Sequence, residues 1–182
     1  MTCIVGYVDK KKRVVYIGGD SAATDDAEVD IRKDPKVFKN NGMIFGYSGS
    51  FRMGQLLRYT LKIPKQKASE SAQRFLCTAF VNAVRDCFVD SGALDGSEAP
   101  DWSFMLGYRG ALYQVYSDFQ VAAVSTPYDA TGGGRAYAMG AMHVLHPCKL
   151  APEVKIRRAL GAAATYVTGV RRPFKIVKLA AE

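Results

Sequence analysis

The sequence predicts an α+β fold in which two antiparallel sheets pack together and helices cover them. Apolar residues make up 48% of the 182 residues, which is enough for a substantial core. Segments typical of strands occur in blocks, and pairs of segments with helical periodicity separate these blocks. The order is strands, two helices, strands, two helices and a last strand, which favours sheets and helices layered in one domain.

The strands are predicted from β-branched, apolar segments between turn residues. The first two flank the polar turn Lys10 to Arg13, and the next two flank Asn40-Asn41-Gly42, where Asn-Gly tolerates the positive φ of a hairpin turn. Arg109-Gly110 predicts another tight turn. Strands are expected at 3–8, 14–19, 37–38, 43–47, 102–108, 111–116, 119–124 and 173–179, with a short one near 28–32.

Four helices are predicted from apolar residues that recur every three or four positions. Pro64 and Pro147 mark two of their ends, because proline cannot continue a helix. The helices are expected at 50–62, 69–91, 137–145 and 152–168. The segments 20–35, 92–101 and 126–134 show neither the helical repeat nor the alternation of a strand, and are expected to form loops.

Composition and charge narrow the range of functions. No apolar run approaches the ~20 residues that span a bilayer, and the N-terminus lacks a secretory pattern, so we expect a soluble cytoplasmic protein with no membrane partner. The net charge is +8. Its densest cluster, Lys10 to Arg13, falls in a predicted turn, which favours a solvated turn over a nucleic-acid contact.

The cysteines and histidines predict no metal site and no cofactor. The four cysteines have neither metal-ligand nor disulfide-scaffold spacing, so we expect free thiols that lie mostly in the core. They are Cys3, Cys77, Cys87 and Cys148. His143 and His146 share a helix face near Cys148, but no further ligand is close in sequence, which favours a surface histidine pair over a zinc site.

The second residue carries the most informative chemistry. A small residue at position 2 allows an aminopeptidase to remove Met1, which would give Thr2 a free α-amine beside its hydroxyl. One residue would then supply a nucleophile and its general base, a known way to activate threonine. Cys3 is adjacent, but only residue 2 becomes N-terminal, and nothing predicts the lowered pKa that a thiolate nucleophile needs.

Five segments occur in the order and near the spacing of a known family. They are Thr2–Gly6, Val15–Asp20, Pro35–Phe38, Ile44–Ser50 and Ala130–Gly134. Together they resemble the proteasome β-subunit family of N-terminal nucleophile (Ntn) hydrolases, which includes the bacterial heat-shock proteasome-related peptidases. The resemblance implies a four-layer αββα sandwich of two antiparallel sheets, as a single domain over residues 1–182.

The resemblance also implies an activity and partners. It implies a threonine endopeptidase that cleaves peptide bonds in peptides or unfolded proteins, assembles into a homo-oligomeric ring and works with an ATP-dependent unfoldase. Helix contacts between subunits are expected at the small, semi-apolar stretch from Ala136 to Leu145.

Four catalytic residues follow from the same resemblance. Thr2 matches the nucleophile, and Asp20 matches the acidic residue after the second strand. Lys36 matches the lysine at the start of the third strand and is preferred over Lys33 because it opens the apolar pair before the hairpin. Gly49 matches the glycine whose N–H builds the oxyanion hole.

Each of these residues also has a plainer explanation. Asp20 could end a strand, Lys36 could be an exposed strand lysine, and Gly49 could form only a strand-to-helix turn. Physical chemistry favours the catalytic assignment of the set, because a lysine ammonium lowers the pKa of a nearby hydroxyl and an aspartate fixes that lysine.

Two positions depart from the family pattern. The family's serine in the glycine-rich loop corresponds to Gly133, and its acidic residue after the last long helix falls near Thr165 or Thr168. Two alternatives therefore stay open: a catalytically weak or inactive homologue that acts as a self-assembling ring or structural protein, and a non-proteolytic Ntn amidase. The run Gly132 to Gly134 lacks the following Lys-Ser/Thr of a phosphate loop and does not favour nucleotide binding.

Overall fold

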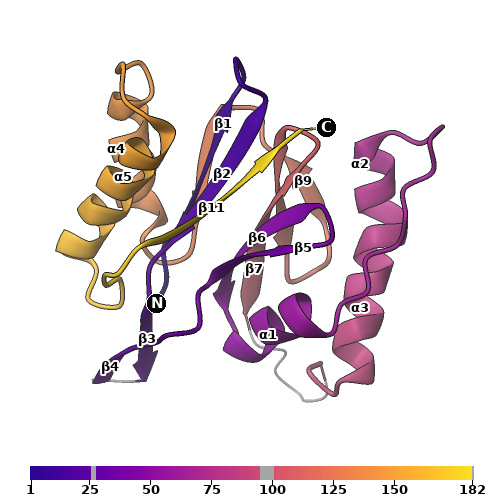
Figure 1. Ribbon diagram of the computed structural model, residues 1–182. Helices are drawn as coiled ribbons and strands as arrows, with labels where there is room; N and C mark the ends of the chain where they lie inside the picture. The colour runs from indigo at the N-terminus through magenta and orange to yellow at the C-terminus, as the bar shows by residue number, and fades with distance from the viewer. Residues whose placement is uncertain (26–27, 95–100, 182) are drawn as a thin grey trace.

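Two antiparallel sheets form the centre of the computed structural model, which describes residues 1–25, 28–94 and 101–181 (Figure 1). The first sheet has the strand order β10-β1-β2-β11. Its strands are β1 (Ile4–Asp9), β2 (Val14–Gly19), β10 (Tyr128–Thr131) and β11 (Lys175–Ala180). The second sheet has the strand order β5-β6-β7-β8-β9. Its strands are β5 (Val37–Asn40), β6 (Met43–Gly49), β7 (Trp102–Tyr108), β8 (Ala111–Tyr116) and β9 (Val121–Ala123).

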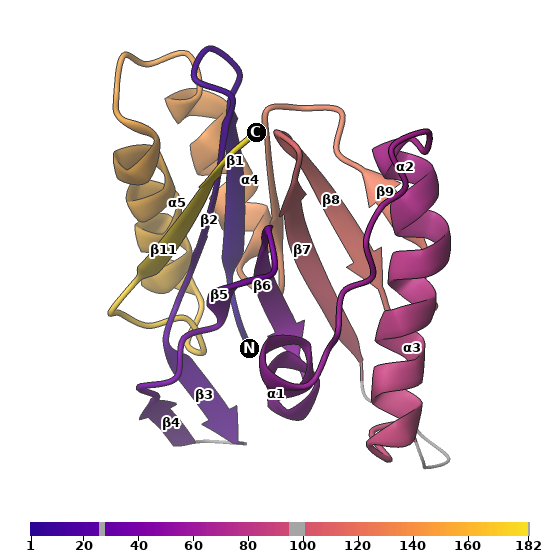
Figure 2. The same cartoon turned by 45° about the vertical axis from the view of Figure 1, so that its right-hand side comes forward.

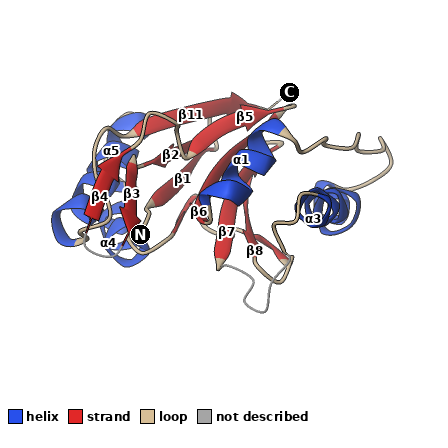
Figure 3. Ribbon diagram, turned by 90° about the horizontal axis from the view of Figure 1, so that it is seen from below, coloured by secondary structure: helices blue, strands red, loops and turns tan. Residues whose placement is uncertain are grey.

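A two-stranded hairpin and six helical segments complete the described chain. The hairpin consists of β3 (Ala22–Asp25) and β4 (Glu28–Ile31), beside the N-terminus (Figures 1 and 3). The helical segments are α1 (Phe51–Tyr59), α2 (Ala72–Phe75), the π-helical turn η1 (Leu76–Phe80), α3 (Val81–Asp90), α4 (Arg135–Leu145) and α5 (Pro152–Tyr166). Ser50 caps the start of α1, where its hydroxyl accepts a hydrogen bond from the Met53 N–H at 3.3 Å.

Apolar side chains from both sheets pack against each other between them. This central cluster includes Ile4 and Ile17 from the first sheet and Ile44 and Met105 from the second. A second cluster lies between the first sheet and the helices α4 and α5, and a third lies between the second sheet and the helices α1 to α3. Figures 1 and 2 accordingly show α4 and α5 along one side of the paired sheets and α2 and α3 along the other.

The predicted mixed fold with antiparallel sheets is confirmed, and three local predictions are wrong or incomplete. Residues 128–131, predicted as part of a loop, form β10 and pair with β1. The predicted loop 20–35 contains β3 as well as the short strand expected near 28–32. The predicted helix 69–91 is helical over 72–90, but its centre is the π-helical turn η1. In the predicted loop 92–101, residues 95–100 lie outside the described residues.

The predicted burial of the cysteines is also partly wrong. All four are free thiols, but Cys77 and Cys148 are exposed, Cys87 is half-buried and only Cys3 is fully buried. Across the described ranges, no helix is long and apolar enough to cross a membrane.

Candidate active site

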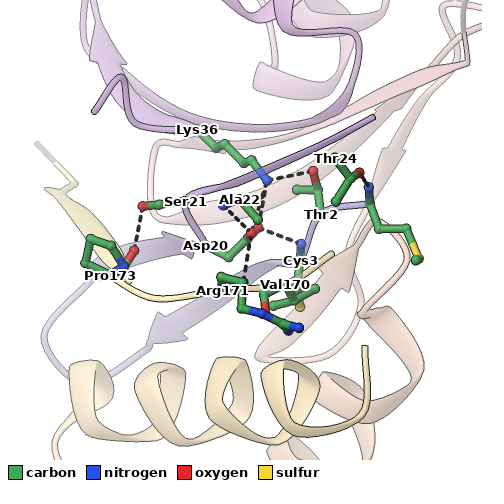
Figure 4. Close-up of polar contacts among 11 residues, drawn as sticks. Thr2, Cys3, Asp20, Ser21, Ala22, Thr24, Lys36, Val170, Arg171 and Pro173 are labelled. Carbon is green, nitrogen blue, oxygen red and sulfur yellow. Dashed lines mark hydrogen bonds and ion pairs between the residues drawn. The ribbon is translucent and has the colours of Figure 1, made fainter. Parts of the chain in front are cut away.

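Thr2, Asp20 and Lys36 meet at one end of the first sheet, with almost no exposure to solvent (Figure 4). The Lys36 ammonium donates hydrogen bonds to Thr2 Oγ1 at 2.9 Å and to the two carboxylate oxygens of Asp20 at 3.0 and 3.1 Å. The side chains of Lys36 and Asp20 are 1% and 0% exposed. The arrangement therefore holds a cation against a threonine hydroxyl, with one carboxylate balancing the charge.

Strand pairing explains why residues so far apart in sequence meet. The hairpin of β1 and β2 aligns Ile4 with Gly19, so Thr2 and Asp20 lie just beyond the same end of the two strands. The Asp20 N–H donates to the Cys3 carbonyl at 3.3 Å, which extends this pairing by one step. Lys36 directly precedes β5 of the facing sheet, and its carbonyl accepts from the Tyr47 N–H at 3.1 Å.

Backbone donors fix the Asp20 carboxylate. Its Oδ1 accepts from the Cys3 N–H at 3.0 Å, and its Oδ2 accepts from the Ala22 N–H at 2.9 Å and from the Arg171 N–H at 3.4 Å. A buried carboxylate is stable only when its oxygens are satisfied by hydrogen bonds or a counter-ion. Asp20 has both, so its position and that of Lys36 are defined by the main chain.

Burial determines the electrostatics of this site. Burial lowers the pKa of Lys36, and the adjacent Asp20 opposes this shift. Burial also raises the pKa of the Cys3 thiol to about 12, and the Asp20 charge adds to this effect. A thiol with so high a pKa is protonated at neutral pH and is a poor nucleophile. Of the two lysines considered, Lys36 is buried in the site and Lys33 is exposed.

Gly49 lies in the wall of a groove of about 350 Å³ that also exposes Ser48, Gly132 and Gly133. The φ of Gly49 is +88°, and a Cβ there would lie 2.1 Å from the Asp101 carbonyl oxygen, so the position requires glycine.

The glycine-rich loop holds the main chain of Thr2. Gly132 also has a φ of +88°, and a Cβ there would lie 2.4 Å from the Thr2 carbonyl oxygen. That oxygen accepts a hydrogen bond from the Gly134 N–H at 3.1 Å. The loop thus approaches residue 2 closely enough to fix it, and the groove with Gly49 adjoins this contact.

Met1 is present in the described chain, and its surroundings were not predicted from the sequence. The Met1 amine donates a hydrogen bond to Thr24 Oγ1. A Cβ at Gly133 would lie 3.2 Å from Met1 Cγ, and one at Gly169 would lie 2.7 Å from Met1 Cβ. Sequence patterns could not identify Thr24, because its position depends on how β3 folds back past residue 1.

The positions that depart from the family pattern bring no side-chain support to the site. Gly133 has no hydroxyl, and Thr165 and Thr168 are both exposed. The Thr165 hydroxyl donates instead to the Gly161 carbonyl within α5, at 3.0 Å.

The predicted surface histidine pair is only partly correct. His143 is exposed, whereas His146 is half-buried, with its ring centroid 6.0 Å from that of Tyr7 and 5.5 Å from that of Tyr128. In the part of the chain that the structure describes, no three His, Cys, Asp or Glu residues lie close enough together to hold a metal ion.

Solved structures of proteasome-related proteins share this fold over nearly the whole chain. BPH from Thiobacillus denitrificans, in complex with epoxomicin, has a TM-score of 0.81 at 18% identity, covering 98% of this chain and 99% of that chain. HslV from Trypanosoma brucei has a TM-score of 0.69 at 16% identity, covering 98% and 99%. Anbu, the ancestral β-subunit, from Yersinia bercovieri has a TM-score of 0.66 at 14% identity, covering 99% and 82%.

Comparisons with models of protein families and with curated protein sequences give no match. At these identities the structural likeness is a likeness of fold. The resemblance to proteasome-related peptidases that the sequence predicts is therefore confirmed at the level of fold.

Proposed function

We propose that this chain is a proteasome-like threonine peptidase that becomes active when removal of Met1 frees the α-amine of Thr2. The observation that carries the proposal is the buried hydrogen bond of 2.9 Å from Lys36 Nζ to Thr2 Oγ1, with Asp20 as the counter-ion. An ammonium at this distance stabilises developing negative charge on the hydroxyl oxygen, and so lowers the pKa of the nucleophile.

The proposed reaction proceeds in two stages. The Thr2 hydroxyl attacks the carbonyl carbon of a peptide bond while its proton passes to the free α-amine of the same residue. The protonated amine then gives this proton to the leaving nitrogen as the C–N bond breaks, and an ester to Thr2 Oγ1 remains. Water activated by the amine cleaves the ester, which restores the hydroxyl and releases the acid.

Gly49 is proposed to stabilise the oxyanion in both stages through its backbone N–H. Its place in the groove wall next to the loop that holds Thr2, and its lack of a side chain, support this role. Losing one such donor typically costs about 3–4 kcal/mol of transition-state stabilisation.

The wider proposal covers architecture and assembly. We propose a four-layer αββα Ntn-hydrolase sandwich as one domain over residues 1–182, located in the cytoplasm and assembled into a homo-oligomeric ring. Peptides or unfolded proteins are the proposed substrates, and an ATP-dependent unfoldase is the proposed partner. A solved structure with a similar fold is a helical assembly of the Anbu complex from Pseudomonas aeruginosa. It supports the proposal that a chain with this fold associates with copies of itself.

The absence of a hydroxyl at Gly133 favours a second candidate function. In the family that the chain resembles, the serine at this position hydrogen-bonds the α-amine. A chain without that hydrogen bond fits a weak or inactive homologue with a structural role in a ring, or an amidase that does not act on proteins. In the structural protein the ion pair of Lys36 and Asp20 would be retained for stability, and in the amidase it would act on the Thr2 hydroxyl as in the peptidase.

The test compares processed wild-type protein with Thr2→Ala and Thr2→Ser on unfolded casein, a panel of fluorogenic peptide amides and simple acyl amides. The proposal expects casein and peptide cleavage by wild type, slower cleavage by Thr2→Ser and none by Thr2→Ala. Cleavage of simple amides alone would favour the amidase. Full assembly without hydrolysis in the wild type and in both variants would favour the structural protein.

A further inference from the structure

We propose that Thr24 is the positioning residue that holds the free α-amine of Thr2 in the processed chain. This inference rests on the proposed function and adds a residue to the same site. It assigns to a hydroxyl on β3 the support that a serine at the position of Gly133 gives in the related family.

The first argument is the contact of the Met1 amine. This amine, the N-terminus of the described chain, donates to Thr24 Oγ1, a contact drawn as a dashed line in Figure 4. The backbone nitrogens of consecutive residues lie less than about 4 Å apart. After Met1 is removed, the new α-amine therefore lies within about 6.5 Å of the same hydroxyl, a span that a rotation of the freed terminus or one water in the space that Met1 vacates can bridge.

The second argument is that Gly133 and Gly169, which have no side chains, leave room beside this amine for the Thr24 side chain. A Cβ at Gly169 would lie 2.9 Å from the Thr24 methyl group and 3.1 Å from the Met1 nitrogen. The three atoms nearest to a Cβ at Gly133 would all belong to Met1, at 3.2 to 3.4 Å. Gly169 thus makes room for the Thr24 side chain, and among the described contacts of this amine Thr24 supplies the hydrogen bond.

The third argument concerns what the amine must do. To accept the proton of the Thr2 hydroxyl, the amine must point its lone pair at that oxygen, so its N–H groups need other partners. A threonine hydroxyl can accept one of them. The charges that act on the pKa of the neighbouring Met1 amine are Lys36 and Asp20. Lys36 has no acceptor to offer, and both Asp20 oxygens already accept from Lys36 and from backbone N–H groups. Thr24 is therefore suited to orient the base, without a part in bond making.

The test uses processed chains of wild type, Thr24→Val, which keeps the branched shape, and Thr24→Ser, which keeps the hydroxyl. Two quantities are measured: the pKa of the Thr2 α-amine, by competitive acetylation and peptide mapping, and the rate of covalent modification by epoxomicin, by intact mass. We expect Thr24→Val to lower the α-amine pKa by about half a unit or more, since the ammonium loses an acceptor. We expect its modification rate to fall about tenfold.

Variants that restore a hydroxyl distinguish a positioning role of Thr24 from a role in packing alone. Thr24→Ser should stay close to wild type in both quantities. Adding Gly133→Ser to Thr24→Val should restore part of the rate, because the atoms nearest to a Cβ at Gly133 belong to Met1, which processing removes. Thr24→Ala with and without Gly133→Ser repeats the comparison if the valine variant does not fold.

An unchanged pKa and rate in Thr24→Val, or an equal loss in Thr24→Ser, would overturn the inference. If the proposed function itself is wrong, the result is different: the wild-type chain would carry a free Thr2 amine but would not form the covalent adduct with epoxomicin. The pKa comparison would still decide the role of Thr24 in that case.

Discussion

At the scale of single residues, the site combines two buried charges with one hydroxyl. Removing an ammonium and a carboxylate from water costs several kcal/mol for each ion, and their pairing repays this only with good geometry and further hydrogen bonds. Asp20 meets that condition through the backbone N–H groups of Cys3 and Ala22, and Lys36 through its bond to Thr2. The hydroxyl is thus part of what makes the buried lysine stable.

The ion pair gives the first prediction. Lys36→Met should abolish activity and destabilise the fold by about 3–5 kcal/mol, because it leaves the Asp20 carboxylate buried without a counter-ion. Urea unfolding measures this loss. The double variant Asp20→Asn/Lys36→Met should recover part of the stability and none of the activity. A double variant no more stable than the single one would contradict this account of the charges.

The second prediction concerns pH. Burial and then the Lys36 charge lower the pKa of the Met1 amine below its ordinary value of 8.0, and Asp20 opposes them. Because Lys36 Nζ is 2.9 Å from the Thr2 hydroxyl, the same causes should act on the Thr2 amine after processing. The amine is a base only when neutral, so the epoxomicin modification rate should rise with pH and level off, with a midpoint below 8.0. A midpoint at or above 8.0 would count against the site as described.

At the scale of elements, turns and short loops place the reactive groups. Gly49 ends β6 with a φ of +88°, a conformation that strains residues with a side chain by about 1–3 kcal/mol. A Cβ at this position would also lie 2.1 Å from the Asp101 carbonyl oxygen, which adds a steric reason for glycine. The groove beside Thr2 therefore depends on the local backbone of the β6–α1 junction.

Replacing this glycine gives the third prediction. Gly49→Ala should lower the free energy of unfolding by about 1–3 kcal/mol or more and remove most of the activity. Gly140→Ala is the matched control, because a Cβ at this helical position meets nothing within 4 Å. The control should be neutral or stabilising by up to about 1 kcal/mol. Equal effects of the two variants in thermal unfolding and peptidase assays would refute the special role of position 49.

Several elements could be predicted from the sequence, and others could not, for physical reasons. The Asn41-Gly42 and Arg109-Gly110 turns signal their hairpins locally, through residues that adopt positive φ. Strand β10 has no such signal, because it is four residues long and its buried Asp129 interrupts the apolar pattern. That carboxylate accepts from the neighbouring Ala130 N–H at 2.8 Å and from the Gln114 amide of β8 at 3.1 Å, a contact that only the folded chain supplies.

At the scale of the whole molecule, some residues of the site could be predicted from the sequence and others could not. The resemblance to the family implies Thr2, Asp20 and Lys36 as one set, and the sheet pairing brings them within hydrogen-bond distance. The contact of Thr24 with the N-terminal amine depends on how β3 folds back to the N-terminus. The close approach of Gly132 to Thr2 depends in the same way on the path of the glycine-rich loop. The spacing of residues in the sequence does not reveal either path.

Assembly gives the fourth prediction. On the outer helices, Val144 of α4 is 67% exposed, and Tyr137 stacks on Tyr166 of α5 with both rings exposed. If subunits meet through α4, Val144→Lys should shift the protein to smaller species in sedimentation velocity at the same concentration. Val89→Lys, an exposed position on α3, is the control and should leave the assembly unchanged. Identical sedimentation of both variants and wild type would exclude α4 as the contact.

The central claim is that Thr2, once N-terminal, is the nucleophile, and intact mass tests it most directly. The protein is expressed without tags at its N-terminus and weighed before and after incubation with epoxomicin, a peptide epoxyketone whose ring adduct needs both the hydroxyl and the free amine of one residue. The account predicts a chain without Met1 that takes one inhibitor molecule at Thr2, and no adduct in Thr2→Ala. A chain that keeps Met1, or that loses it and takes no adduct, would contradict the claim.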